Sequence, residues 1–214
     1  MSTLLMALLA AMVLPLFVGA WRVSLLGLCC QGLLMGWLVM ESRPALTSAD
    51  DWLTLTDLIL VRGLVAPWFL YGVLHAGEAG ARNDVIPPNL LSWTLAGALV
   101  LIGFNFASTV VPEAGDERQL VAVAAAGLFL AFLVLSTQSG PFSQMVGALR
   151  FENALALFEL GGTSHREESI LVHAGQLVLF LLTIGMFRWY LEGVGPSAPV
   201  EAHVKDEAPE GPTL

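Results

Sequence analysis

Long runs of apolar residues, separated by short polar breaks rich in proline and glycine, dominate this chain. About 20 consecutive apolar residues make a helix long enough to cross a hydrocarbon layer of ~30 Å. Counting runs of that length predicts seven spans. They cover residues 3–20, 23–40, 52–75, 90–111, 119–138, 142–160 and 168–191. The pattern therefore predicts an all-α polytopic membrane protein whose transmembrane helical domain is residues 1–192.

The two ends of the chain carry different signals. No Lys or Arg precedes the first run, and apolar sequence resumes soon after it, so we expect a retained helix and not a signal peptide. Residues 193–214 are rich in Pro, Gly, Ala and Glu, which predicts a disordered tail. Positive residues collect slightly on one side of the predicted spans, at Arg22, Arg82, Arg188 and Lys205. This bias predicts a cytoplasmic C-terminus and an external N-terminus in the inner (plasma) membrane.

Composition agrees with a membrane environment and narrows the function. Of the 214 residues, 56% are hydrophobic and 13% charged, against about 25% charged in typical soluble domains. The formal net charge of −9 comes mainly from loops and the tail, which argues against nucleic acid as a partner. Cys29 and Cys30 are adjacent within an apolar run and match no disulfide or metal spacing, so we interpret them as packing residues. The chain also lacks phosphate-binding and haem-attachment motifs, so no catalytic residue, cofactor site or metal site is predicted.

Glu152 is the most informative polar residue, because it lies near the middle of an apolar span. An ionised carboxylate at the bilayer centre costs at least ~2.5–3.5 kcal/mol unless it is paired or hydrated. Glu152 therefore indicates either a proton or ion pathway, or a buried acid, neutral or paired with an Arg, that holds helices together. Glu159 follows about two turns later on the same face, roughly 10 Å along the axis, whereas Arg150 points elsewhere.

The third span contains an acid, a base and a proline: Asp57, Arg62 and Pro67. Five residues subtend about 140° on an α-helix, so a direct Asp57–Arg62 pair requires a distortion caused by Pro67 or an intervening helix. We therefore expect Arg62 to pair with an acid on another helix. Glu152 is the first candidate, and an acid of a neighbouring subunit is the alternative.

The seventh span carries His173 and Gln176 on a common face. If the sixth and seventh spans form a hairpin, Glu159 and His173 reach a similar depth near the outer surface. Because an imidazole titrates near neutral pH, that pair could serve as a proton port, or it could be a simple interfacial hydrogen bond. In the second span, Gly32 and Gly36 have the spacing of small residues that allows close helix packing.

Two motifs resemble the hydrogenase-4 component E family, membrane subunits of group 4 hydrogenase and formate hydrogenlyase complexes. The segment RGLVAP at residues 62–67 has the family's basic residue five before a proline, and GALRFEN at residues 147–153 matches its Gly-x-x-x-x-Glu-Asn. The resemblance extends over residues 1–191 in length and layout. Residues 119–191 are similar to subunit K of respiratory complex I.

The resemblance implies a non-catalytic subunit of a complex-I-related oxidoreductase that contributes to proton or ion translocation and to assembly of the membrane arm. Its expected partners are antiporter-like subunits and membrane subunits near the quinone or hydrogenase arm. The implied ion pathway comprises Glu152, Glu159, Arg62, Asp57, His173 and Gln176. The resemblance also suggests a duplicated three-helix unit, in which the first three spans echo the last three and Gln31 lies opposite the acid.

Two departures from the family pattern weaken a complete proton relay. The family commonly has Lys at the position of Arg62, and a desolvated Lys can lose its proton whereas Arg effectively cannot. The family also tends to have an acid in the seventh helix, where this chain offers Gly175 or Gln176 with His173 nearby. Proton transfer would then need waters or residues from neighbours. A subunit of an ion-driven transporter (antiporter or inorganic-carbon uptake) and a structural spacer remain the alternative functions.

Overall fold

The computed structural model describes residues 3–18, 21–42, 48–76, 90–137, 140–161 and 170–193, and within these ranges the chain is helical and has no strand. The elements are α1 (Thr3–Phe17), α2 (Trp21–Ser42), α3 (Ala49–Leu55), η1 (Thr56–Val65), α4 (Ala66–Ala76), α5 (Leu90–Val110), α6 (Asp116–Thr137), α7 (Pro141–Gly161) and α8 (Ile170–Gly193). Because α3, η1 and α4 follow one another without a break, they form one continuous rod. The predicted all-α class is confirmed for the described residues.

The helices coincide with the predicted apolar runs, within a few residues at each end. By length and composition, four helices of the described chain can cross a membrane: Trp21–Ser42, Ala49–His75, Trp93–Val110 and Asp116–Thr137. Helix α1 is a shorter apolar helix. The count of seven spans therefore stays a prediction. The predicted tail from residue 194 onward, and Arg82 and Lys205 of the orientation argument, lie outside the described residues.

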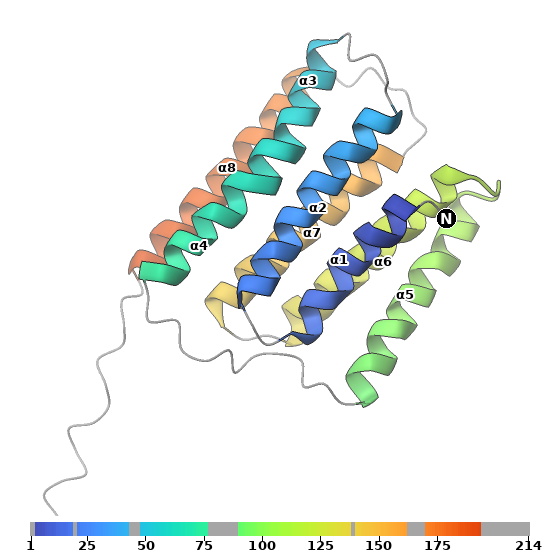
Figure 1. Ribbon diagram of the computed structural model, residues 1–214, viewed down its shortest axis with the longest axis horizontal. Helices are drawn as coiled ribbons and strands as arrows, with labels where there is room; N and C mark the ends of the chain where they lie inside the picture. The colour runs from blue at the N-terminus through green and yellow to red at the C-terminus, as the bar shows by residue number, and fades with distance from the viewer. Residues whose placement is uncertain are drawn as a thin grey trace, which may run out of the picture.

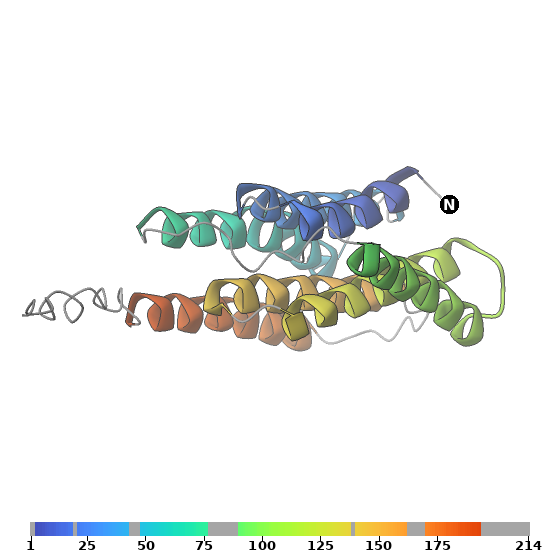
Figure 2. The same cartoon turned by 90° about the horizontal axis from the view of Figure 1, so that it is seen from below.

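The helices are arranged in two layers (Figures 1 and 2). Helices α1 and α2 and the α3–η1–α4 rod make one layer; α6, α7 and α8 make the other, with α5 packed along α6. Contacts between the layers join α1 to α6, α2 to α7, and the rod to α8. Each of these facing pairs runs in the same direction in Figure 1. The two three-helix units thus share order and direction, which the expected duplication requires.

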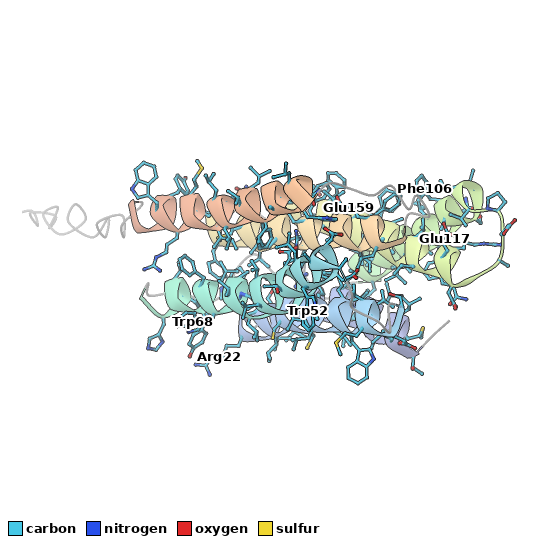
Figure 3. All side chains as sticks on the ribbon, turned by 90° about the horizontal axis from the view of Figure 1, so that it is seen from above. Arg22, Trp52, Trp68, Phe106, Glu117 and Glu159 are labelled. Atoms are coloured by element: carbon cyan, nitrogen blue, oxygen red, sulfur yellow. The ribbon has the colours of Figure 1, made fainter. Side chains whose placement is uncertain are left out.

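The distribution of side chains over this bundle is inverted relative to a water-soluble protein. Large apolar side chains project outward from both layers (Figure 3), and some are almost fully exposed, such as Trp189 at 77% and Leu101 at 72%. Polar side chains are buried instead, including Arg62, Arg150 and Asn153. An apolar exterior around a partly polar interior suits a hydrocarbon solvent, in which ionisable residues face the bundle interior.

The two largest clusters of buried apolar residues lie at different heights in the interior. The first contains Leu5, Leu8, Met12, Met35, Val39, Leu58, Val123, Ala124, Ala156 and Leu157. The second contains Leu25, Leu28, Val61, Ala66, Leu70, Met145, Val146, Leu149, Phe180 and Ile184. Along α2 and α7, Gln31 and Asn153 fall between members of the two clusters, and along the rod Arg62 follows Leu58 of the first cluster and Val61 of the second. The buried polar groups therefore lie near mid-height, with apolar packing on both sides.

Glycine sets the distance between α2 and the rod. A Cβ atom added to Gly32 would lie 2.5 Å from the Gly63 Cα atom and 2.7 Å from the Leu58 carbonyl oxygen. One added to Gly36 would lie 2.3 Å from the Cγ1 atom of Ile59. Two of these neighbours are backbone atoms, so they cannot move aside by a change of rotamer. The backbones of α2 and η1 approach this closely only because Gly32 and Gly63 lack side chains.

We predict that Gly32→Ala destabilises the bundle by about 1–3 kcal/mol, the usual cost of overpacking a close contact. The matched control is Gly97→Ala on α5, where an added Cβ meets no atom within 4 Å. The control should leave stability unchanged or raise it slightly, because Ala favours a helix more than Gly does. Unfolding by SDS in mixed micelles measures both variants. Equal stabilities of the two variants would contradict the close contact.

Candidate functional site

The rod widens into a π-helix along η1, immediately before Pro67. At its end, the Ala66 N–H donates to the Val61 carbonyl, an i→i−5 hydrogen bond. A proline in an α-helix has no N–H to donate, and its ring clashes with the carbonyl of the residue four positions earlier. The i→i−5 pattern moves the carbonyls upstream of Pro67 out of α-helical register. Such segments are rare and often lie at functional sites.

This widened helix brings Asp57 and Arg62 together. The Arg62 Nε atom donates to the Asp57 Oδ2 atom at 2.8 Å. An i→i−5 helix has more residues per turn than an α-helix, so residues five apart diverge by much less than the ~140° that separates them on an α-helix. The expectation that Arg62 pairs with Glu152 or with another acid outside its own helix is therefore wrong. That expectation holds for regular α-helical geometry, and here the helix is distorted just before Pro67.

Arg62 also forms a hydrogen bond to a helix of the other layer. Its residue exposure is only 6%, and the Nη1 atom donates to the Oδ1 atom of Asn153 on α7 at 3.4 Å. Its guanidinium carbon lies 4.4 Å from the ring centroid of Phe180 on α8, a distance at which a cation is attracted to an aromatic face. Arg62 therefore ties the rod to two helices of the other layer. Its charge is compensated by Asp57 and by the ring.

Asn153 continues the network toward the other end of the first layer. Its Nδ2 atom donates to the Oε1 atom of Gln31 at 3.3 Å, and the Gln31 Nε2 atom donates to the Ala11 carbonyl, also at 3.3 Å. Gln31 is 1% exposed and Asn153 is 2% exposed. We call Asp57, Arg62, Asn153 and Gln31 the polar layer. It links η1, α7, α2 and α1 by hydrogen bonds at mid-height.

A second buried arginine lies beside the polar layer. Arg150 is 6% exposed, and its Nη2 atom donates to the Ser24 hydroxyl on α2 at 3.0 Å. Ser24, Arg150 and Asn153 are not among the site residues predicted from the sequence. Asn153 was nevertheless visible as the last residue of GALRFEN, and Gln31 as the residue expected opposite the acid.

Glu152 lies outside this network. It is half-buried, and within the described residues no hydrogen bond or ion pair involves its carboxylate. The face of α7 on which it lies also carries Leu155 and Glu159, both exposed. Adjacent residues on a helix differ by about 100° in direction, so Asn153 points inward while Glu152 points toward the outer face. The expected acid is thus near the midpoint of α7, but not in the interior of this chain.

A second group of polar contacts lies where the end of α7 meets α8, and where the start of α8 meets the start of α3. The Gln176 Nε2 atom donates to the Glu159 Oε1 atom at 3.3 Å, which joins α8 to α7. His173, one turn earlier, places its Nδ1 atom 2.7 Å from the Oδ1 atom of Asp50 on α3. Glu159 is therefore in contact with Gln176, one turn from His173 on α8, while His173 itself contacts Asp50. Asp50 was not nominated from the sequence, because it was assigned to the loop before the third span.

The described residues contain no group of three or more His, Cys, Asp or Glu side chains that could hold a metal ion. Comparison with protein-family models, with curated proteins and with solved structures finds no match to this chain. The site is therefore defined by its own geometry: a charge-compensated polar layer inside the bundle, and an acid on its outer face, Glu152, that has no partner among the residues the structure describes.

We predict that Asp57→Asn destabilises the chain by about 3–5 kcal/mol, because it leaves the buried Arg62 without its counter-charge. Arg62→Met should cost a comparable amount, since Asp57 would then be the uncompensated charge. The double variant Asp57→Asn/Arg62→Met removes both charges and should recover much of the loss. SDS unfolding of the three variants gives the coupling free energy.

An exposed acid supplies the control for these three variants. Asp116→Asn changes the same functional group in the first turn of α6 and should stay within ~0.5 kcal/mol of the parent, as is usual for surface substitutions. If the single changes at Asp57 and Arg62 proved additive, the two residues would not form a pair.

Proposed function

We propose that this chain is a non-catalytic membrane subunit of a complex-I-related, hydrogenase-type oxidoreductase, in which it contributes to proton or ion translocation and to assembly of the membrane arm. One observation carries the proposal. The two segments that resemble the hydrogenase-4 component E family, residues 62–67 and 147–153, lie far apart in sequence but meet in the polar layer, where Arg62 donates to Asn153. Two separately recognised motifs thus form one buried site.

In this proposal the groups have different roles. Asp57 and Arg62 form a fixed ion pair that sets the electrostatic field inside the bundle, because an Arg does not release its proton. Glu152 is the exchangeable group, since a carboxylate can gain and lose a proton. Its partly exposed position on α7 suits exchange with a water path or a side chain of a neighbouring membrane subunit. Glu159 with Gln176 lies nearer the membrane edge on the same face.

A second candidate function is a structural spacer between pumping subunits. It is favoured by the composition of the polar layer: Gln31 and Asn153 do not titrate, and Arg62 is already paired with Asp57. Such a layer fixes helices in register without moving protons. The two functions differ in what they require of Glu152, which the spacer does not need as an acid.

Membership in a complex has a direct test. A C-terminally tagged chain, purified from native membranes in mild detergent, should bring down antiporter-like membrane subunits together with subunits that carry hydrogenase-type or quinone-linked redox centres. Antiporter-like partners without redox subunits would favour the ion-driven transporter instead. Purification as a stable single chain would contradict the subunit assignment altogether.

Glu152→Gln tests the role in translocation. The amide keeps the volume and hydrogen-bonding capacity but removes the titratable group, so the complex should assemble while ion pumping per electron falls toward background. Because Arg62 has Asp57 as its counter-charge, Glu152→Ala should also leave the chain folded. The measurement is pumping relative to electron transfer by the reconstituted complex.

Glu159→Gln is the matched control, because the same chemical change is made two turns away on the same face. Its effect should be smaller, since an exposed carboxylate near the membrane edge exchanges directly with bulk water. Unchanged coupling in an assembled Glu152→Gln complex would favour the spacer function.

A further inference from the structure

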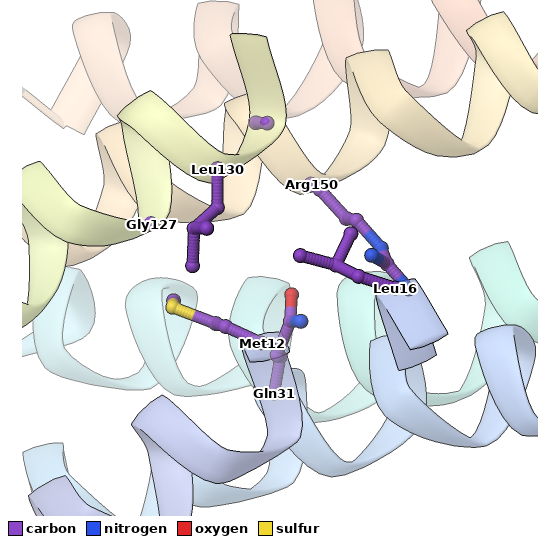
Figure 4. Close-up of a pocket in the computed structure, with 7 residues that line it drawn as sticks. Met12, Leu16, Gln31, Gly127, Leu130 and Arg150 are labelled. Carbon is purple, nitrogen blue, oxygen red and sulfur yellow. The ribbon is translucent and has the colours of Figure 1, made fainter. Parts of the chain in front are cut away.

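A small cavity lies between the two layers beside the polar layer (Figure 4). Its volume is about 10 Å³, and its lining comes from α1, α2, α6 and α7. Met12, Leu16 and Leu130 supply apolar walls, while Gln31 and Arg150 supply polar groups. In Figure 4 the side chains of Gln31 and Arg150 approach the cavity from different helices. The two buried polar groups therefore share one small space.

We propose that this cavity binds one water molecule, which bridges Arg150 and Gln31. About 10–15 Å³ is the least space that accommodates a single water, and a buried water needs at least two polar partners. Purely apolar cavities stay empty, but this one has a guanidinium and a primary amide in its wall, from residues that are 6% and 1% exposed. The cavity thus meets both requirements, size and polarity.

The hydrogen-bonding capacity of the lining fits such a water. The Gln31 Oε1 atom accepts one bond from Asn153, and an amide oxygen has two lone pairs. A guanidinium carries five N–H donors in a planar fork, so Arg150 can donate to Ser24 and to a water at the same time. The bound water accepts from Arg150 and donates to the Gln31 oxygen.

This water would connect the two polar groups of the interior. The hydrogen-bonded chain then runs from Ser24 through Arg150, the water and Gln31 to Asn153, and from there to Arg62 and Asp57. Both buried arginines become parts of one network that crosses between the layers. The inference concerns hydration of the chain itself and does not depend on the proposed function.

Radiolytic footprinting tests the site, because methionines report on water next to them. Brief X-ray irradiation converts water into hydroxyl radicals, which oxidise adjacent methionine to its sulfoxide. Met12 lines the cavity, whereas Met35 and Met145 are equally buried but are not among the residues that line it. With the chain in lipid nanodiscs, we expect oxidation of Met12 and background levels at Met35 and Met145. Protection of Met12 equal to that of Met35 and Met145 would overturn the proposal.

Two variants distinguish oxidation of Met12 by a bound water from oxidation by radicals that form elsewhere. Gln31→Leu removes one polar partner, so the oxidation of Met12 should be lost while Met35 and Met145 stay protected, which also reports an intact fold. In Gly127→Ala the new Cβ would lie 2.8 Å from the Met12 sulfur, so the methionine must shift and the water should be displaced. Unchanged oxidation of Met12 in both folded variants would show that no water bridges these groups.

Discussion

The ion pair between Asp57 and Arg62 is the interaction on which the rest of this bundle depends. An unpaired charge at the centre of a bilayer costs at least ~2.5–3.5 kcal/mol, and several times more where the helix is isolated and no water reaches it. Here the counter-charge lies on the same helix, so the α3–η1–α4 rod is compensated before it meets any other helix. The hydrogen bond to Asn153 and the contact with Phe180 then hold the pair in the interior and fix the rod against the second layer.

The pair exists only because the helix around it is widened, and several residues cooperate to allow this. Pro67 opposes regular α-helical bonding just downstream, and η1 replaces that bonding with i→i−5 hydrogen bonds. A wider helix packs poorly against a neighbour, but Gly63 and Gly32 remove the side chains where η1 meets α2. Proline, π-helix, glycine contact and ion pair are therefore mutually dependent. The motif at residues 62–67 contains three of these features, which explains in physical terms why a base, a glycine and a proline occur together.

Much of the fold could be predicted from the sequence, because an apolar run of about 20 residues has few ways to satisfy its backbone in lipid other than a helix. The interaction partners of individual side chains were harder to predict from the sequence. The direction of Arg62 relative to Asp57 was wrong by less than half a turn, because ~100° per residue was applied to a segment that is not α-helical. His173 was matched to Glu159, yet it contacts Asp50, which begins the rod and was assigned to a loop. Neighbours on a helix differ by 100°, so composition alone could not decide whether Glu152 or Asn153 enters the core.

Asn153 points into the bundle, where its side chain is hydrogen-bonded. Glu152 points toward the outer face of α7, and its carboxylate has no partner among the described residues. Within the described residues, the interior charge of Arg62 is compensated by Asp57. The outer face of α7 is different. There a carboxylate near mid-height stands beside exposed Leu155, a combination that hydrocarbon does not solvate. In hydrocarbon, a carboxylate needs a neighbouring helix or a water-filled path as its partner. A group that compensates Glu152 would therefore have to reach this face of α7, and not the core of the bundle.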